Sequence, residues 1–342
     1  RGHSRQPSES RRVEGERNRR QARRYHARDI RRRSRAAFPF GWTAIIVVVV
    51  RICPSVPFPS LLAPYMTHFF ADDGEKIHVQ VAGDGSPVLM LHGWTASYRE
   101  WTPFLGQLMA HHRVYRWDAR GHGGHRLSRA TLPTVQCMAR DLRNLIEHYA
   151  LQDVVAVGHS MGALTLWQYI TDNGCRDLRK VCFIDQSPKL LTDDDWLNGI
   201  YGDFDHERSA AFLRQLEHDF AESVLQLGGM GLNEQARRKY AENSRGLEKA
   251  RQWLQEQDPA PLIACWESLT EADYRATLGR IDIPALLVYG GASNYYRADT
   301  AHYVKSRIAG AVLHIYEGTD HSPHQWERDR FVSDLRDFID SP

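Results

Sequence analysis

Short apolar runs alternate with amphipathic segments from Met66 onward, and this alternation is the dominant pattern of the chain. The runs predict strands at residues 76–81, 87–91, 114–117, 154–157, 181–184, 285–289 and 311–315. Helical periodicity predicts helices at residues 101–110, 135–149, 160–171, 297–308 and 331–339. Because strands that alternate with helices form βαβ units, we expect a largely parallel sheet covered by helices. Residues 76–81 alternate between polar and apolar and are predicted to form an edge strand.

One interval interrupts this rhythm. Between Pro188 and Arg280 about ninety residues contain no strand pattern, which is too long for a loop in a compact domain. The interval is helical in pattern instead, at residues 207–226, 233–256 and 261–269. We therefore predict a core formed by residues 66–188 and 277–342, with a helical cap at residues 189–276 placed where it covers the ends of the strands.

The first 65 residues differ from the rest in charge. Residues 1–35 carry fourteen arginines against four acidic residues, a net charge of +10, and they cannot bury enough apolar surface to fold. Residues 36–50 are mostly apolar, with the length of a signal-peptide core and not of a spanning helix. Because the first methionine is Met66, we expect residues 1–65 to be disordered or outside the working protein. A secretion or membrane-anchor signal is the alternative, and a basic arm for nucleic acid is disfavoured for lack of interleaved aromatic residues.

Composition narrows the classes of function. Hydrophobic residues make up 42% and charged residues 25% of the chain, as in an ordinary globular protein. The five cysteines show no C-x-x-C spacing, so we expect reduced thiols in a cytoplasmic protein, or an exported one if the apolar segment is a true signal. The sequence offers no metal-ligand cluster and no dinucleotide-binding fingerprint. We therefore expect no metal or cofactor, no nucleic-acid partner, and no membrane partner unless the N-terminal extension is genuine.

The strongest chemical motif is the G-x-S-x-G pentapeptide at residues 158–162, which follows one predicted strand and precedes a predicted helix. Such a motif needs glycine on both sides because its serine sits on a tight, strained turn. The turn exposes the Ser160 hydroxyl and directs the helix N-terminus, with the Met161 amide, toward a developing negative charge. Ser160 is therefore the candidate nucleophile and Met161 a candidate oxyanion donor.

A second loop supplies the other oxyanion donor. His92-Gly93-Trp94 follows the buried strand at residues 87–91, the place from which that donor is expected. The backbone N–H of Trp94 is the candidate, paired with that of Met161. His92 is expected to fix this loop by hydrogen bonds and not to act as the base.

At these motifs the chain resembles the α/β-hydrolase family, and the resemblance extends from Met66 to Ile339. The matching segments are residues 92–94, 118–123 (Asp-Ala-Arg-Gly-His-Gly), 158–162 and 320–324 (Asp-His-Ser-Pro-His). The cofactor-free haloperoxidase and esterase branch is the most similar. The resemblance implies a mostly parallel, eight-stranded sheet with helices on both faces and a helical cap.

Members of this family use a catalytic triad of nucleophile, base and acid, and the resemblance identifies the base. In this family the base is a histidine after the last strand, which here is His321, with His324 as a rival that is expected to line the pocket or pack. The family's acid usually follows the strand after the cap, where this chain has the uncharged Ser293 and Asn294. Asp185 ends the strand beside that of the nucleophile, so its carboxylate can reach His321. We predict Asp185 as the third member, with Asn294 or Ser293 as neutral alternatives, or no third member.

These residues imply acyl transfer in two steps. Ser160 attacks, the Trp94 and Met161 amides hold the oxyanion, and water hydrolyses the acyl-enzyme with His321 as base. Aromatic residues favour a small or medium apolar ester, and the candidate pocket walls are Trp94, Tyr98, Trp101, Trp196, Tyr201, Trp266 and Tyr296. We predict a carboxylesterase-like serine hydrolase. Perhydrolase, haloperoxidase-like or lactonase activity at the same site is the first alternative, and a ligand-binding receptor with weak catalysis is the second.

Overall fold

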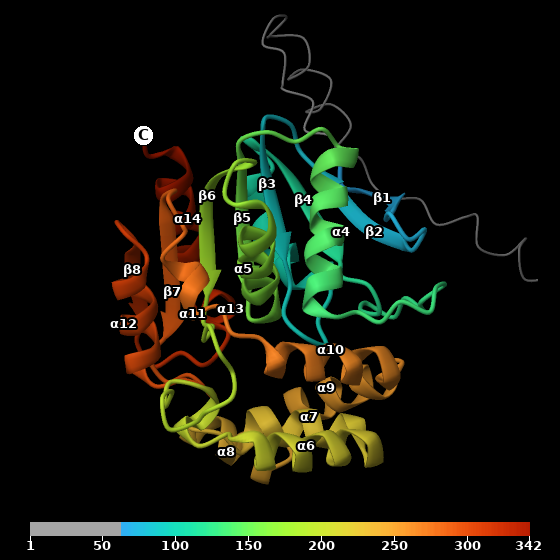
Figure 1. The fold of residues 1–342 in the computed structure, drawn as a ribbon, viewed down its shortest axis with the longest axis vertical. Helices are drawn as coiled ribbons and strands as arrows, with labels where there is room; N and C mark the ends of the chain where they lie inside the picture. The colour runs from blue at the N-terminus through green and yellow to red at the C-terminus, as the bar shows by residue number, and fades with distance from the viewer. Residues whose placement is uncertain (1–62) are drawn as a thin grey trace, which may run out of the picture. The chain divides into compact units, whose positions relative to one another are not determined.

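The strands form one eight-stranded sheet in the order β1-β2-β4-β3-β5-β6-β7-β8 (Figure 1). The structure, a computed structural model, describes residues 63–342, which belong to one compact unit. The strands are β1 (Tyr65–Phe70), β2 (Lys76–Ala82), β3 (Ser86–Leu91), β4 (His112–Asp118), β5 (Val154–His159), β6 (Leu178–Ile184), β7 (Ala285–Gly290) and β8 (Val312–Tyr316). Neighbours from β4 to β8 are parallel, whereas β1–β2 and β2–β4 pair antiparallel. The predicted mostly parallel sheet is confirmed.

The prediction that residues 76–81 form an edge strand is wrong. β1 pairs along the whole of β2, from Tyr65 opposite Val81 to Phe70 opposite Lys76, so β1 is the edge. The alternation in β2 arises because Ile77 and Val79 face the core while the residues between them are partly exposed. Tyr65 therefore belongs to the sheet, although the sequence places it in the N-terminal extension.

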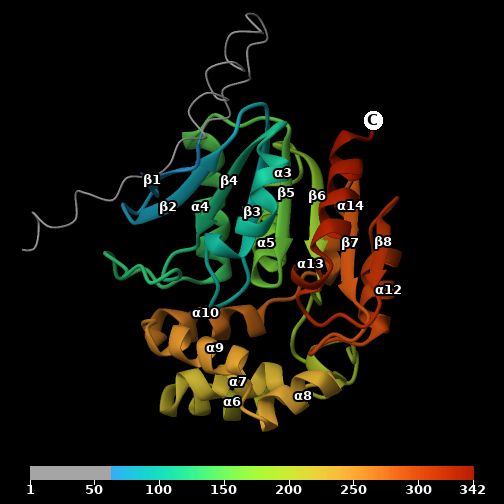
Figure 2. The same ribbon diagram turned by 180° about the vertical axis from the view of Figure 1, so that it is seen from behind.

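Helices cover both faces of the sheet. α4 (Val135–His148), α5 (Met161–Asn173) and α12 (Ala298–Arg307) lie on one face (Figure 1), and α3 (Leu105–Leu108) and α14 (Arg328–Asp340) on the other (Figure 2). Successive residues of β5 join opposite layers: Val154 and Ala156 pack in one hydrophobic cluster, Val155 and Val157 in the other. A strand buried on both faces has no polar positions, which explains the continuous apolar runs in the sequence.

A helical segment at residues 200–278 connects β6 to β7 and lies at the carboxyl ends of the parallel strands (Figures 1 and 2). Its elements are η2 (Ile200–Gly202), α6 (His206–His218), α7 (Phe220–Gly229), α8 (Glu234–Ala241), α9 (Arg245–Gln255), α10 (Pro259–Glu271) and α11 (Arg275–Leu278). The remaining helices are η1 (Tyr98–Phe104) and α13 (Pro323–Trp326). The helix predicted at residues 101–110 is divided between the end of η1 and α3.

Two helices predicted as continuous in this segment are each divided in two. Asp219 separates α6 from α7, and its side chain accepts a hydrogen bond from the Glu222 N–H at 3.1 Å. Ser244 starts α9 in the same way by accepting from the Leu247 N–H at 3.4 Å. Each of these short polar side chains accepts a hydrogen bond from an unpaired N–H group in the first turn of the next helix. The interruption of each predicted helix is therefore the N-cap of a new one.

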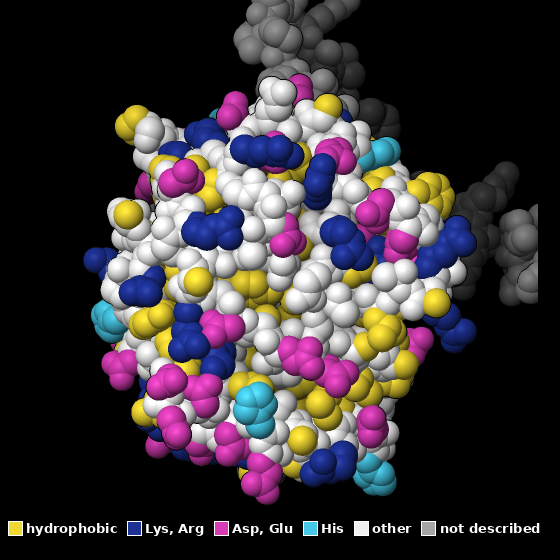
Figure 3. Space-filling model, viewed as in Figure 1, with side chains coloured by type: hydrophobic (Ala, Val, Ile, Leu, Met, Phe, Trp, Pro, Cys, Tyr) yellow, Lys and Arg dark blue, Asp and Glu magenta, His cyan; other side chains and the backbone are white. Residues whose placement is uncertain are grey.

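Several predictions concern residues outside the described part of the chain, including the arginine-rich segment and the apolar segment at residues 36–50. Within residues 63–342, no helix is both long enough and apolar enough to cross a membrane. The cysteines of the described residues are unpaired and buried. On the face drawn in Figure 3, basic and acidic side chains are interspersed, with hydrophobic side chains between them.

The Asp-Ala-Arg-Gly-His-Gly motif at residues 118–123 serves the packing of the core. The Arg120 guanidinium is fully buried, 2.5 Å from the Asp141 carboxylate and 2.8 Å from that of Asp73. Burial raises the pKa of Asp141 to about 6, although Arg120 opposes this shift. Arg120 thereby ties α4 to the loops that follow β1 and β4.

We expect Asp141→Ala to destabilise the fold strongly, because it leaves the buried Arg120 guanidinium with only the half-exposed Asp73 partner. Removal of one member of a buried ion pair costs about 3–5 kcal/mol in free energy of unfolding. Urea unfolding measures this change. Glu147→Ala, which breaks an exposed pair with Arg143 on the same helix, is the control. Equal stability of the two variants would contradict a structural role for the buried pair.

Candidate active site

Ser160 lies on the tight turn between β5 and α5, with φ 51° and ψ −117°. This backbone conformation is rare for a residue with a side chain and marks stored strain. A Cβ on Gly158 would lie 2.6 Å from the backbone carbon of Gly162, and a Cβ on Gly162 would collide with the Leu91 carbonyl. The two glycines therefore allow β5, the turn and α5 to pack this closely against the end of β3.

The two predicted oxyanion donors line the same pocket as Ser160. Met161 is the first residue of α5, so its N–H has no carbonyl partner within the helix. Trp94 follows β3, and among the described residues its backbone N–H donates no hydrogen bond. Both N–H groups are available to a bound oxyanion.

His92 fixes the loop that carries Trp94, as expected from the sequence. Its Nε2 accepts from the Ala119 N–H at 3.0 Å, which leaves the proton on Nδ1, 2.8 Å from the Gly93 carbonyl. Because both ring nitrogens are occupied and the side chain is fully buried, His92 has no access to the pocket.

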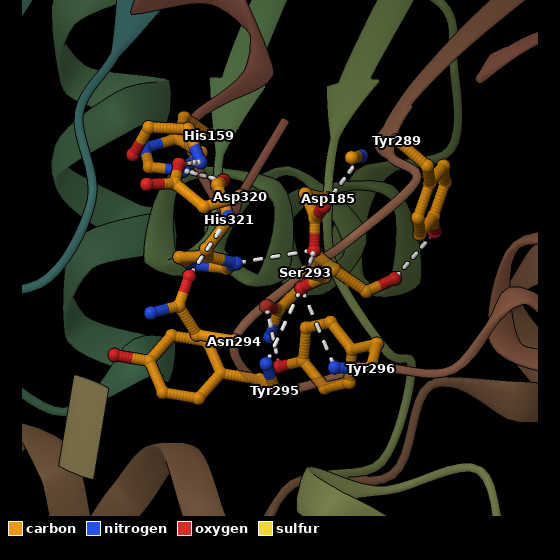
Figure 4. A network of polar contacts seen from close by, with 12 residues as sticks. His159, Asp185, Tyr289, Ser293, Asn294, Tyr295, Tyr296, Asp320 and His321 are labelled. Carbon is orange, nitrogen blue, oxygen red and sulfur yellow. Dashed lines mark hydrogen bonds and ion pairs between the residues drawn. The ribbon is translucent and has the colours of Figure 1, made fainter. Parts of the chain in front are cut away.

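The structure brings His321 and Asp185 together, with His321 Nδ1 3.1 Å from Asp185 Oδ1 (Figure 4). The Asp185 carboxylate is fully buried, and it also accepts from the Gly290 N–H at 2.7 Å and from the Ser293 hydroxyl at 2.9 Å. A carboxylate held by these donors fixes the proton of His321 on Nδ1. The Nε2 of His321 is then free to accept a proton from a group in the pocket.

Ser293 and Asn294, the alternative third members, do not contact the ring of His321 through a hydrogen bond in the described structure (Figure 4). The Ser293 hydroxyl donates to Asp185. The Asn294 side-chain oxygen accepts from the backbone N–H of His321 at 3.1 Å, and its Nδ2 donates to the Gly228 carbonyl at 2.6 Å. Both residues support the positions of Asp185 and of the His321 loop.

The pocket has a volume of about 400 Å³ and lies between the ends of the strands and the helical segment. Among the aromatic residues predicted to line it, Trp94, Trp266 and Tyr296 do so. Tyr98, Trp101, Trp196 and Tyr201 do not. Trp101 is fully buried against His324, and Trp196 packs on Tyr303. The sequence pattern marks aromatic residues but not the direction in which each side chain points.

Tyr295 and Glu100 are among the lining residues that the sequence analysis does not predict. Tyr295 packs edge-on against the His321 ring, with 4.5 Å between ring centroids. Glu100 also lines the pocket, and it comes together with His159 and His324 so that one ligand-type atom of each lies within 4.8 Å of the others. His324 thus packs behind the pocket and does not line it. No local motif marks Glu100, because its partners come from distant parts of the chain.

The fold and these motifs define an enzyme class. The chain belongs to the alpha/beta hydrolase family, whose family model matches residues 88–335. It is 27% identical to a non-heme haloperoxidase of Rhodococcus erythropolis over 81% of this chain and 100% of that protein. It is 25% identical to a pimeloyl-[acyl-carrier protein] methyl ester esterase of Vibrio vulnificus, over 77% and 97%. A solved esterase from Exiguobacterium antarcticum superimposes with a TM-score of 0.70 at 22% identity, over 80% and 99%.

Burial lowers the pKa of His321, although the Asp185 carboxylate opposes this effect. A lowered pKa keeps the imidazole neutral, and therefore able to accept a proton, down to a more acidic pH. We expect an NMR titration of His321, assigned by comparison with His321→Gln, to give a midpoint below the ordinary value of about 6.5. A midpoint above that value would contradict the dominance of burial.

Proposed function

We propose that this protein is a serine hydrolase that cleaves a small or medium apolar ester through an acyl-enzyme on Ser160. One observation supports the proposal: Ser160, Trp94, Met161 and His321 all line one pocket, and the buried Asp185 carboxylate lies against the His321 ring. This arrangement has a nucleophile, a base, an orienting acid and two oxyanion donors.

In the proposed mechanism, His321 Nε2 accepts the Ser160 proton as the hydroxyl oxygen attacks the acyl carbon. The carbonyl oxygen becomes an oxyanion held by the two backbone N–H groups at the start of α5 and after β3. His321, now an imidazolium beside the Asp185 carboxylate, gives its proton to the leaving alcohol. A water molecule then adds to the acyl-serine with His321 again as base, which releases the acid and restores Ser160.

The pocket wall supports an apolar acyl substrate. Apolar side chains from α5, from the connection after β6 and from the helical segment dominate the lining, and these include Leu164, Leu190, Ile200, Val224, Leu227 and Leu269. The volume of about 400 Å³ is within the range of small-molecule sites. The relatives named as esterases act in the same chemical class. Natural substrate identity can be approached by comparing p-nitrophenyl esters of increasing acyl length with lactones.

Perhydrolysis is the second candidate function, supported by the relative named as a non-heme haloperoxidase. In this reaction hydrogen peroxide replaces water at the same acyl-serine and yields a peracid. Peracid formation from an ester and peroxide, measured beside acid formation, separates the two activities. A lactonase differs only in that the leaving alcohol stays attached to the acyl group. A ligand-binding receptor would bind the ester with little turnover.

We expect a fluorophosphonate probe to label Ser160 covalently, because the phosphonyl oxygen occupies the oxyanion site and the hydroxyl is activated by His321. Mass spectrometry of the labelled peptide identifies the modified residue. Ser160→Ala removes the hydroxyl and is expected to remain unlabelled. An unlabelled wild-type protein, folded by circular dichroism, would contradict every hydrolase form of the proposal.

We expect Asp185→Asn to lower kcat by about 10³- to 10⁴-fold, because an amide neither fixes the His321 tautomer nor stabilises its charged form. Steady-state hydrolysis of a p-nitrophenyl ester measures the change. Asn294→Ala, which removes only a support of the loop, is the matched comparison and is expected to cost far less. The reverse order of the two losses would assign the third position to Asn294.

A further inference from the structure

A second buried carboxylate lies beside the proposed catalytic residues. The Glu100 side chain, on η1, is 9% exposed and accepts from the backbone N–H of Gly93 through Oε2 at 3.0 Å. Gly93 directly precedes Trp94, the proposed oxyanion donor. The Glu100 carboxylate therefore holds the His92–Gly93 peptide, which directly precedes the peptide that carries this donor.

The other carboxylate oxygen faces two histidines. Glu100 Oε1 lies 2.9 Å from His324 Nε2 and 2.7 Å from His159 Nδ1, the latter an ion-pair contact and not a linear hydrogen bond. His159 is the residue before Ser160, and His324 lies three residues after His321. One carboxylate thus joins the oxyanion loop, the nucleophile turn and the base loop.

The contacts of His159 determine its protonation. Its Nε2 lies 2.9 Å from the backbone carbonyl of His321, and a carbonyl oxygen can only accept, so Nε2 carries a proton. Its Nδ1 lies 2.7 Å from a carboxylate oxygen, so a second proton would place the positive charge of the ring beside the negative charge of Glu100. The contacts of His159 therefore favour its imidazolium form. Burial disfavours this charge, but the Glu100 carboxylate outweighs burial and raises the pKa of His159.

We propose that Glu100 is a positioning residue that, through the buried His159 imidazolium, sets both the oxyanion loop at Gly93 and the base loop at His321 relative to Ser160. This inference rests on the proposed hydrolase function. His159 packs against Gly93 on one side, where a Cβ on the glycine would lie 3.1 Å from its Nδ1, and holds the His321 carbonyl on the other. Displacement of the ion pair would move an oxyanion donor and the base together.

The distances favour an ion pair over a metal site, although one carboxylate and two imidazoles are common zinc ligands. Donor atoms about 2.0–2.1 Å from a tetrahedral zinc lie roughly 3.3 Å apart. Here both nitrogens lie closer than that to the same oxygen atom, at 2.7 and 2.9 Å. The contact of His159 Nδ1 also favours a proton where a metal would need a free lone pair.

Glu100→Gln tests this inference with little change in shape. The amide has one acceptor and one donor end, so in either orientation its NH₂ group faces a donor: the Gly93 N–H or the two histidines. We expect kcat for a p-nitrophenyl ester to fall by about 10²-fold, as for an active-site misplacement near 1 Å, while KM changes little. The rate of fluorophosphonate labelling of Ser160 should fall in parallel.

Glu75→Gln is the matched control, because Glu75 is also a buried carboxylate that accepts backbone N–H groups, from Ser128 and Arg129, in another part of the chain. We expect Glu75→Gln to lower the unfolding midpoint with kcat unchanged. If Glu100→Gln lowers the unfolding midpoint like the control and leaves kcat unchanged, its role is structural and the inference is overturned.

His159→Gln gives a second test that does not depend on the folding of the first variant. A ¹⁵N NMR titration of the wild-type protein is expected to show a histidine that keeps both nitrogens protonated above the ordinary midpoint of about 6.5, and this signal should be lost in His159→Gln. Absence of an imidazolium in the wild type would overturn the inference. So would a loss of wild-type activity in EDTA that zinc restores, since that result would assign the cluster to a metal.

The role of Glu100 can still be tested if the proposed ester hydrolysis is wrong. If wild-type protein hydrolyses no ester but its Ser160 is labelled, the labelling rates of the wild type, Glu100→Gln and Glu75→Gln still report the position of the oxyanion loop. A slower rate in Glu100→Gln alone supports the inference without turnover. Equal rates in all three proteins overturn it.

Discussion

The close approach of the β5–α5 turn to the end of β3 constrains every other part of the site. Ser160 takes up a strained conformation there, and Gly158 and Gly162 have no room for a side chain. With this packing the first residue of α5, Met161, and the loop residue Trp94 line the same pocket, and their N–H groups are the proposed oxyanion donors. The strain is maintained because β5 is buried on both faces and residues 161–170 of α5 are buried around the turn.

Parallel topology explains how the acid can come from β6 instead of following β7. β6 and β7 are adjacent, and their carboxyl ends meet at one edge of the sheet. Asp185 leaves β6 there, and the turn after β7 supplies the Gly290 N–H and the Ser293 hydroxyl that orient its carboxylate. The turn after β7 has no carboxylate at the position that the family usually uses for the acid. It contributes hydrogen-bond donors to the Asp185 carboxylate instead.

Two buried carboxylates act on two histidines with opposite results. Asp185 meets only one nitrogen of His321, so burial prevails and the base stays neutral. His159 has an oxygen atom near each nitrogen, and the Glu100 carboxylate raises its pKa, which favours the imidazolium form. The positive charge on His159 also opposes protonation of His321, since the ring centroids are 4.9 Å apart. The number of acceptors around each ring therefore explains why His321 is suited to accept a proton whereas His159 favours a positive charge.

The sequence by itself determined the order of strands and helices, the Gly158–Gly162 turn and the loop at Trp94, because each depends on local periodicity or backbone geometry. It also placed Asp185 and His321 at strand ends that a parallel sheet brings to one edge. Two predictions from the sequence were wrong: the edge of the sheet is β1, and one predicted helix is two helices divided at Asp219. The pairing of an edge strand and a single N-cap residue leave little trace in the periodicity of apolar residues. Only the tertiary structure decided which aromatic residues line the pocket and that Glu100 meets His159 and His324. Those contacts join side chains far apart in the chain, and their directions depend on packing that no local pattern records.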